Sequence, residues 1–357
     1  MTTHEHAPAQ GAPRLDVRSL STSFATEEGR IQSVADVSFR IMPGQTLALV
    51  GESGSGKSVT SLSLMGLHAK TSHARVEGEA RFVLRDGRAV DLLRLDHKSL
   101  RGLRGNEMAM VFQEPMTSLN PVLTVGEQIA ESVRLHKGLD RAGAMAHARR
   151  MLELVEIPAA AQRVREYPHQ LSGGMRQRVM IALAMACDPT LLIADEPTTA
   201  LDVTIQAQIL ALMGRLQRET GMSILFITHN LGVVAQYADA IAVMYAGRIV
   251  ETASVHDLFA APLHPYTRGL LGCLPGVARK REQENAAGRV DGAARRRLDA
   301  IPGQVSSPLA PPPGCAFAPR CGRRLEACDA AMPALEVIDA DRWPMRQVRC
   351  IRAGETA

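Results

Sequence analysis

Short apolar runs that end in a polar side chain alternate with amphipathic stretches along this chain. The runs 46–50, 191–195 and 224–228 predict buried strands, and a fourth predicted strand leads into Gln113. Apolar residues at three- and four-residue spacings predict helices over Val125 to His136 and Arg141 to Val155. The polar residues that follow the strands therefore become the first candidates for a functional site.

The first of these strands runs directly into a glycine-rich loop. A loop of this pattern between a strand and a helix presents backbone N–H groups to phosphates. We expect Lys57 to contact the β- and γ-phosphates of ATP and Ser58 to offer its hydroxyl to Mg²⁺. The predicted ATP-binding residues here are Gly51, Glu52, Ser53, Gly54, Ser55, Gly56, Lys57, Ser58 and Val59.

Three other strand ends carry candidate catalytic side chains. Asp195 and Glu196 follow an apolar run, an arrangement that places Asp195 in the Mg²⁺ shell and Glu196 beside the attacking water. His229 could reach the γ-phosphate, and Gln113 could contact the metal and the water. A lone His or Gln is usually structural, so these two assignments depend on the neighbouring motifs.

A second glycine-rich phosphate contact lies at Leu171-Ser172-Gly173-Gly174-Met175. Ser172 is a suitable N-cap for a helix through Met175, Val179 and Leu183. Gly173 and Gly174 leave the amides at the start of this helix bare, and a helix N-terminus attracts an anion.

These motifs, with Ala200-Leu201-Asp202, occur in the order found in the ATP-binding cassette (ABC) family, which residues 14–260 resemble. The resemblance implies an α/β fold with a RecA-like core, an antiparallel β subdomain and a helical subdomain at about 115–170. It implies a head-to-tail dimer that holds each ATP between the glycine-rich loop Gly51 to Ser58 of one subunit, called the P-loop, and the segment Leu171 to Met175 of the other, called the signature. It also assigns Asp202 to the nucleotide site and Phe24 to the adenine, although the family usually has Tyr there and an isolated Phe is more often a core residue.

Composition limits what such an ATPase could drive. The chain has 357 residues, a net charge of +4 and a mean hydropathy of −0.04. Its apolar run Met180 to Cys187 is much shorter than the ~20 residues of a membrane helix. Residues 1–13 lack an apolar signal core, so we expect a short disordered lead and a cytoplasmic protein. Aromatic residues make up only 3%, without a basic stripe, so nucleic-acid binding is not indicated.

Three segments resemble the dipeptide and oligopeptide importer branch, which includes nickel and glutathione systems. They are Glu114 to Pro121, His264 to Leu271 and Gly314 to Cys321. The resemblance implies a C-terminal domain at 261–357 and inward transport of peptides. It implies two polytopic membrane permease subunits as partners, one of which would insert a coupling helix into the groove beside Gln113. It also implies a heterodimer with a second, related ATPase. An extracytoplasmic solute-binding protein would be an indirect partner. The chain would then lie peripherally at the cytoplasmic face of the cytoplasmic membrane.

Two alternatives to peptide import stay open. The same ATPase could serve nickel, glutathione or another small solute, since partner subunits choose the cargo. A cassette ATPase that acts on DNA or ribosomes is the more distant alternative, because such proteins carry coiled-coil arms or two cassettes. The polar segment Ala278 to Arg297 predicts a solvated linker, with a lipid-facing basic patch as the alternative.

Cys315, Cys321, Cys328 and Cys350 crowd into the C-terminal region. Stable disulfides are rare in the cytosol, so a metal centre explains four thiols better. Their spacing lacks the Cys-x-x-Cys pairs of common zinc sites. The family resemblance favours a [4Fe-4S] cluster, while Zn²⁺ and unligated thiols stay open. The other two cysteines, Cys187 and Cys273, are expected to be packing residues.

Overall fold

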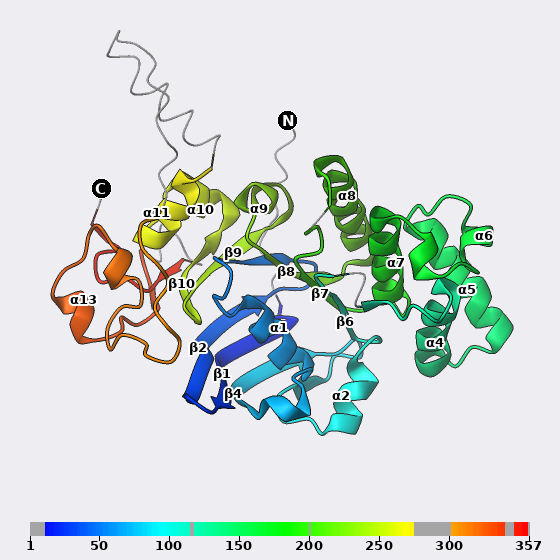
Figure 1. The fold of residues 1–357 in the computed structure, drawn as a ribbon, viewed down its shortest axis with the longest axis horizontal. Helices are drawn as coiled ribbons and strands as arrows, with labels where there is room; N and C mark the ends of the chain where they lie inside the picture. The colour runs from blue at the N-terminus through cyan, green and yellow to red at the C-terminus, as the bar shows by residue number, and fades with distance from the viewer. Residues whose placement is uncertain (1–10, 115–117, 200, 275–300, 340–345, 356–357) are drawn as a thin grey trace, which may run out of the picture.

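The computed structural model describes residues 11–114, 118–199, 201–274, 301–339 and 346–355, which form two β-sheets flanked by helices (Figure 1). The larger sheet has the strand order β11-β12-β10-β9-β3-β8-β7-β6. Its strands are β3 (Thr46–Val50), β6 (Met108–Val111), β7 (Leu191–Asp195), β8 (Ser223–Thr228), β9 (Ala240–Tyr245), β10 (Arg248–Ser254), β11 (Glu336–Val337) and β12 (Gln347–Val348). The smaller sheet is antiparallel in the order β2-β1-β4-β5, from β1 (Leu15–Thr26), β2 (Gly29–Ile41), β4 (Ala74–Val83) and β5 (Ala89–Asp91).

Five neighbouring strands of the larger sheet, β9, β3, β8, β7 and β6, run parallel. Their carboxyl ends therefore meet at one edge, where ligands bind in open α/β sheets. The predicted strands 46–50, 191–195 and 224–228 are confirmed, and Gln113 follows the end of β6 at Val111. The α/β fold class is confirmed as well.

Side chains alternate between the two faces of the larger sheet, as the two-residue period of a strand requires. Leu191 and Ile193 of β7 pack towards the antiparallel sheet and towards α1 (Lys57–Met65). Leu192 and Ala194 pack against helices on the opposite face. These helices are α4 (Val125–Lys137), α5 (Arg141–Leu154), α7 (Gly173–Met185) and α8 (Val203–Thr220).

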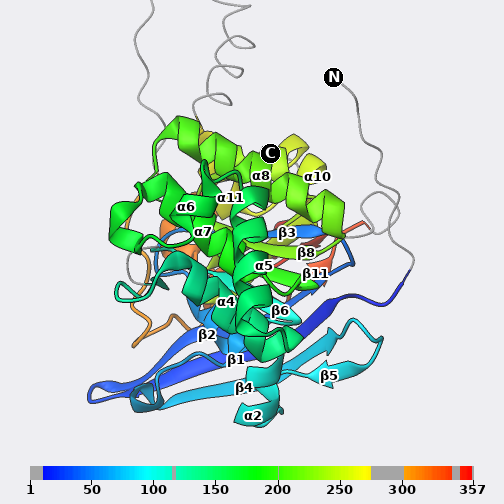
Figure 2. The same cartoon turned by 90° about the vertical axis from the view of Figure 1, so that its right-hand side faces the viewer.

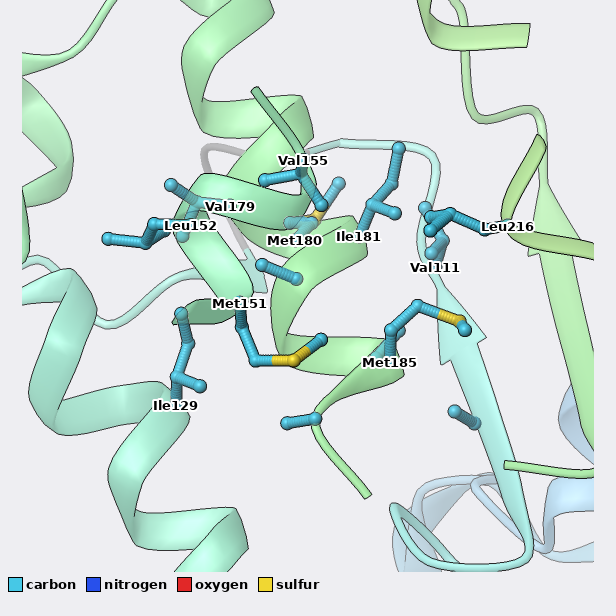
Figure 3. Packing of buried hydrophobic residues seen from close by; sticks show 14 of the residues in the cluster. Val111, Ile129, Met151, Leu152, Val155, Val179, Met180, Ile181, Met185 and Leu216 are labelled. Carbon is cyan, nitrogen blue, oxygen red and sulfur yellow. The ribbon is translucent and has the colours of Figure 1, made fainter. Parts of the chain in front are cut away.

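The two helices predicted from the sequence periodicity are confirmed. Helices α4 and α5 match the two predicted helices to within one residue at each end, and the side chains of Thr124 and Asp140 cap them. Their apolar residues meet α7 in one continuous core, to which Ile129 of α4, Met151 of α5 and Met180 of α7 all belong (Figure 3). Figure 2 shows α4, α5 and α7 together on one side of the molecule. The limits of a helical subdomain at 115–170 stay a prediction.

The remaining helical elements are short. They are α2 (His97–Leu103), α6 (Ala160–Arg163), α9 (Leu231–Tyr237), α10 (Val255–Ala260), α11 (Pro265–Gly272), α13 (Ala327–Ala330) and the 3₁₀ turns at Lys70–Ser72, Pro168–Gln170 and Ala318–Arg320. Within the described ranges, every helix is too short or too polar to cross a membrane.

The C-terminal region packs directly onto the cassette. Strand β12 pairs with β10 through Thr252 and Gln347, and so continues the larger sheet. Phe317 joins a third apolar core with Tyr245 of β9 and Tyr266 of α11. A domain boundary at residue 260 stays a prediction, and the two regions share this sheet and this core.

Several expectations fall outside the described residues. They are most of the disordered lead at 1–13, the linker Ala278 to Arg297, residues 115–117 of the segment after Gln113, and Ala200 of the Ala200-Leu201-Asp202 motif.

Candidate functional site

The P-loop folds around its own lysine. Lys57 Nζ donates to the carbonyl oxygens of Gly51 and Glu52, each at 2.9 Å, and lies 3.4 Å from Ser55 Oγ. Burial lowers the pKa of Lys57, and the carboxylates of Glu196, Asp195 and Glu52 oppose that shift. The ammonium is therefore held at the mouth of the loop by acceptors that an anionic phosphate can replace.

Two glycines of the loop are required by close backbone approach. A Cβ atom at Gly51 would lie 2.1 Å from the carbonyl oxygen of Met244 on β9. At Gly56, where φ is +100°, a Cβ atom would lie 2.4 Å from the carbonyl oxygen of Ser33 on β2. The loop is thus fixed against both sheets, and its tight curve leaves no room for a larger residue.

The predicted Mg²⁺ ligands lie together. Ser58 Oγ donates to Asp195 Oδ1 at 3.1 Å, and Ser61 Oγ lies 3.5 Å from Oδ2 of the same carboxylate. Burial raises the pKa of Asp195, against the hydrogen bond from Ser58. A hydroxyl and a carboxylate are the hard oxygen donors that Mg²⁺ prefers, so this pair fits the ion.

Glu196 is held by three side chains. Its Oε2 accepts hydrogen bonds from Gln113 Nε2 at 3.0 Å and from the Thr199 hydroxyl at 2.9 Å, while His229 Nδ1 lies 3.0 Å from its Oε1. Although burial favours the neutral acid, the hydrogen bonds from His229 and Thr199 lower the pKa of Glu196 below its usual value. The carboxylate is therefore ionised and fixed in orientation.

The backbone at Glu196 is strained, with φ at +45°. Residues outside the ordinary regions persist only where surrounding contacts fix them, and they gather at functional sites. Here the Glu196 N–H donates to the carbonyl of Ile227 on β8 at 2.9 Å. This bond ties the turn after β7 to β8, the strand that His229 follows.

An open cavity of about 600 Å³ lies at this edge of the sheet. Its lining includes Ser58, Gln113, Asp195 and Glu114. The structure therefore brings the P-loop, the Asp195-Glu196 pair, Gln113 and His229 to one place, as the sequence predicted.

The signature residues, Leu171 to Met175, do not line this cavity. Ser172 caps α7 by accepting a hydrogen bond from the Met175 N–H at 3.4 Å, as predicted, and no atom lies within 4 Å of a Cβ placed on Gly173. Because α1 packs on one face of the larger sheet and α7 on the other, the two phosphate contacts belong to different parts of the surface (Figure 1). Roles for Ser172, Gly173 and Gly174 in nucleotide binding stay predictions.

Asp202 and Phe24 are the two other residues predicted to contact the nucleotide. Asp202 caps α8 by accepting a hydrogen bond from Ile205 N. Phe24 lies in β1 with its ring edge-on to that of His68, 5.4 Å between centroids. Their roles towards ATP stay predictions.

Sequence reasoning missed several residues of the site. Thr199 holds Glu196, and nothing in its local sequence marks it beyond a position shortly after the acidic pair. Arg320 of the C-terminal region forms a two-pronged ion pair with Glu52 of the P-loop, at 2.8 and 3.2 Å. The Tyr266 hydroxyl accepts a hydrogen bond from the Glu52 N–H at 2.9 Å. These contacts span more than 200 residues of sequence, so no local pattern signals them.

The four C-terminal cysteines line one small cavity of about 20 Å³, and all four are free thiols. Burial raises the pKa of Cys315 and of Cys350. Within the described part of the chain, however, no three His, Cys, Asp or Glu side chains are arranged to hold a metal ion. The predicted metal centre is therefore not supported. Cys187 is buried in the helical core, as expected of a packing residue, and Cys273 is partly buried at the end of α11.

Comparison with known families places two matches on the chain. Residues 34–199 match the ABC transporter family. Residues 250–295 and 285–328 match the oligopeptide/dipeptide transporter C-terminal region. The second match begins in β10 and includes Tyr266 and Arg320.

Known proteins resemble nearly the full chain. A putative peptide import ATP-binding protein of Brucella melitensis is 51% identical over 345 residues, which is 97% of this chain and 98% of the relative. The dipeptide transport ATP-binding protein DppD of Bacillus subtilis is 49% identical over 319 residues, 89% of this chain and 90% of the relative.

Solved structures show the same cassette. The ATP-binding cassette MJ0796, in a dimeric post-hydrolysis state with ADP and Pi, has a TM-score of 0.59 at 26% identity and covers 68% of this chain and 98% of its own. The protein cbiO1 of Clostridium perfringens, part of the cbiONQ ABC transporter complex, has a TM-score of 0.58 at 25% identity and covers 76% of this chain and 100% of its own. The chain therefore belongs to the ABC transporter family, as an ATP-binding subunit with the oligopeptide and dipeptide type of C-terminal region.

Proposed function

We propose that this chain hydrolyses ATP to power inward transport of dipeptides and oligopeptides through partner membrane subunits. The observation that carries the ATPase role is the fixed, ionised Glu196 beside Lys57, Ser58 and Asp195. The choice of peptides draws on the names of the full-length relatives and on the C-terminal match.

Each residue has a defined task in this proposal. Lys57 exchanges its carbonyl partners for the β- and γ-phosphates, and Ser58 and Asp195 would hold Mg²⁺, which neutralises phosphate charge when bound. Glu196 orients and polarises the attacking water, while Gln113 and His229 keep its two oxygens in place. The bare amides after Ser172 bind the nucleotide of a second ATPase subunit.

Glu196→Gln tests the ATPase role. The amide keeps the shape of the side chain but removes the charge that polarises water, so MgATP binding should persist while turnover falls by about 100-fold or more. Unchanged turnover would refute the assignment. Thr220→Ala is a matched control, because Thr220 lies at the far end of α8, where its hydroxyl donates to the Leu216 carbonyl and accepts from the Met222 N–H.

Uptake by cells tests the cargo. In cells that lack this chain, labelled di- and oligopeptide uptake should be restored by the native sequence but not by Glu196→Gln. If uptake does not change on deletion, peptides are not its required cargo, and nickel and glutathione become the next substrates to measure.

A cavity of about 230 Å³ beside Gln113 supports docking of a membrane permease. It is lined mainly by apolar residues, among them Met65, Leu67, Met110 and Phe112, and two of these are unusually exposed for their size, Leu67 at 36% and Phe112 at 38%. An exposed apolar hollow of this kind is typical of a binding surface. A coupling helix from one of the two permease subunits would fill it and receive the movement of the cassette.

Substitution in this cavity separates docking from hydrolysis. Leu67→Asp should leave the ATPase activity of the isolated subunit within about twofold, because Leu67 lines this cavity and not the one at Ser58 and Asp195, and should abolish uptake. Leu135→Asp, at a position 70% exposed on α4, is the control. Equal uptake by both variants would exclude this cavity as the docking site.

The opposite placement of α1 and α7 supports a composite dimer with a second, related ATPase. The cassette neighbour MJ0796 is itself dimeric. In this proposal the chain lies peripherally at the cytoplasmic face of the membrane, bound to the permeases, and an extracytoplasmic solute-binding protein serves it indirectly. Co-purification of tagged Glu196→Gln with a second, distinct ATPase and the permeases is expected, and a homodimer alone would contradict the heterodimer.

We also propose a metal centre at the four C-terminal cysteines. An iron–sulfur cluster is the favoured group, and Zn²⁺ is the alternative. Its support is that thiols from separate segments line one cavity, although the described arrangement does not fit a metal ion, so no step of ATP hydrolysis is assigned to it. Iron, sulfide and zinc analysis of anaerobically purified protein tests it. Absence of all three, or equal metal content after Cys328→Ser, would contradict it.

A further inference from the structure

We infer that Arg320 of the C-terminal region is a positioning residue of the nucleotide site, which sets ATP affinity by neutralising Glu52 and bracing the P-loop. The inference rests on the proposed nucleotide-binding role of this loop. It gives the C-terminal region a direct part in ATP binding, beyond its packing on the sheet.

Every N–H group of the Arg320 guanidinium has an acceptor. Nη1 donates to Glu52 Oε2 at 2.8 Å and to the Tyr245 hydroxyl at 3.4 Å, and Nη2 donates to Glu52 Oε1 at 3.2 Å and to the Ile301 carbonyl at 3.4 Å. Nε donates to the Pro302 carbonyl at 2.9 Å. Five donors satisfied in one rigid plane fix the guanidinium, and only Arg can make this set of contacts.

The pair is buried mainly on the arginine side. The Arg320 side chain is 6% exposed and that of Glu52 is 29% exposed. The guanidinium also lies 5.8 Å from the centre of the Tyr245 ring. A two-pronged ion pair sheltered from water is much stronger than an exposed one, because solvent screens it less. Glu52 is therefore held in one orientation from the C-terminal side.

The same loop residue is anchored on its backbone. The Glu52 N–H donates to the Tyr266 hydroxyl of α11, and the Glu52 carbonyl accepts from Lys57 Nζ. Glu52 thus joins the lysine that receives phosphate to two residues of the C-terminal region. When Lys57 leaves this carbonyl for ATP, Arg320 and Tyr266 keep the loop in its shape.

Arg320 neutralises the negative charge of Glu52 in the P-loop. The P-loop has to attract a tetra-anionic nucleotide, and a free carboxylate in that loop would repel it. Arg320 cancels the charge of Glu52 without competing with Lys57, whose own acceptors are the Gly51 and Glu52 carbonyls and the Ser55 hydroxyl. Loss of Arg320 should therefore weaken ATP binding more than it slows the chemical step.

Kinetics and binding of the full-length protein test this inference. Arg320→Ala should raise KM and Kd for MgATP about tenfold, from one unpaired charge close to the phosphates, and change kcat less than threefold. Adding Glu52→Gln to Arg320→Ala should recover most of that affinity, because it removes the stray charge. A purely structural role for Arg320 predicts no such rescue.

Arg349→Ala is the matched control. Arg349 is another buried arginine of the C-terminal region, and it pairs with Asp36 of β2 at 3.3 Å rather than with the P-loop. Its variant should leave KM within twofold. If Arg320→Ala does not fold, Arg320→Lys replaces it, with an increase in KM of about threefold that Glu52→Gln again removes.

The outcomes are distinguishable. Lys57→Ala serves as the reference without nucleotide affinity. Native protein that binds MgATP no better than Lys57→Ala would overturn the proposed nucleotide site itself. Native binding together with an unchanged KM in Arg320→Ala, or without rescue by Glu52→Gln, would overturn only the role of Arg320.

Discussion

Arg346 Nη2 lies 2.7 Å from Glu251 Oε1 in an ion pair whose two side chains are both completely shielded from solvent. Glu251 belongs to β10, and Arg346 comes immediately before β12. The same carboxylate accepts hydrogen bonds from the N–H groups of Leu263 and His264 at 3.0 and 2.9 Å. One buried charge thus connects the cassette sheet, the start of α11 and the C-terminal strand.

Breaking this pair should strongly destabilise the protein. Arg346→Met leaves the Glu251 carboxylate buried without its counter-ion, and we expect the free energy of unfolding to fall by about 3–5 kcal/mol. Adding Glu251→Gln to Arg346→Met should recover part of the loss. Denaturant titration measures both, and a loss below about 1 kcal/mol for Arg346→Met would contradict the buried pair.

His264 should make stability depend on pH. Burial lowers its pKa to about 3, whereas an unfolded chain titrates near 6.5. Between those values only the unfolded state takes up the proton, so this contribution is complete above pH 6.5 and is lost as the pH falls, by about 1.4 kcal/mol per unit. His264→Asn keeps an acceptor for the Tyr266 N–H at the helix start and removes the titrating ring.

The difference between native and His264→Asn proteins isolates this group. Denaturant midpoints from pH 7 to 4.5 should fall less steeply for the variant, even though it starts less stable at pH 7. His256→Asn, with a side chain 90% exposed, should retain the native slope. Parallel curves for native and His264→Asn would show that the ring does not titrate as described.

Ser58→Ala should raise the Mg²⁺ concentration required for activity. It removes the hydroxyl that donates to Asp195 and leaves that buried carboxylate as the main oxygen donor. The loss of one such contact is worth about tenfold in the apparent Mg²⁺ constant. ATPase assays over a range of Mg²⁺ measure it, with Ser61→Ala as the comparison because its bond to Asp195 is longer, 3.5 Å. Equal shifts in the two variants would count against a distinct role for Ser58.

Gln113 and His229 should act on hydrolysis through Glu196. Alanine at either position removes one of the bonds that orient the carboxylate, and kcat should fall about 10- to 100-fold with KM little changed. In a Glu196→Gln background, neither substitution should lower the residual rate further, since the group they orient is gone. Steady-state kinetics of the single and double variants decide this, and additive losses would mean independent roles.

The sequence was most informative where local rules apply. A strand that ends in Asp195-Glu196, and helices with caps such as Asp140, are set by short-range period and hydrogen bonding, so α5 was predicted to within one residue of its end. The parallel arrangement of the strands then brings their carboxyl ends together, which explains why most of the candidate site was also predictable.

Contacts between distant segments were not predictable in this way. Glu52 was predicted as an ATP-binding residue, yet its side chain pairs with Arg320, 268 residues further along the chain. No sequence period or motif spacing predicts the Glu52–Arg320 ion pair, because it depends on how α11 and the C-terminal turn pack beside β9. For the four cysteines, clustering in the sequence correctly indicated that they lie together, since all four line one cavity. It did not predict their geometry, because in the described residues they are not arranged as the ligands of a metal ion.

The pairing of β12 with β10 has a consequence for how the protein behaves in a crowded solution. Without the tail, β10 would present a row of unpaired N–H and C=O groups along an open edge, to which strands of other molecules could add. The chain's own strand β12 pairs with the middle of that edge, at Glu251 and Thr252, and the new outer strand β11 is only two residues long, too short to recruit another chain. The C-terminal region thereby shields this edge of the sheet from pairing with another molecule. This effect on aggregation is separate from the contribution of Arg320 to nucleotide binding.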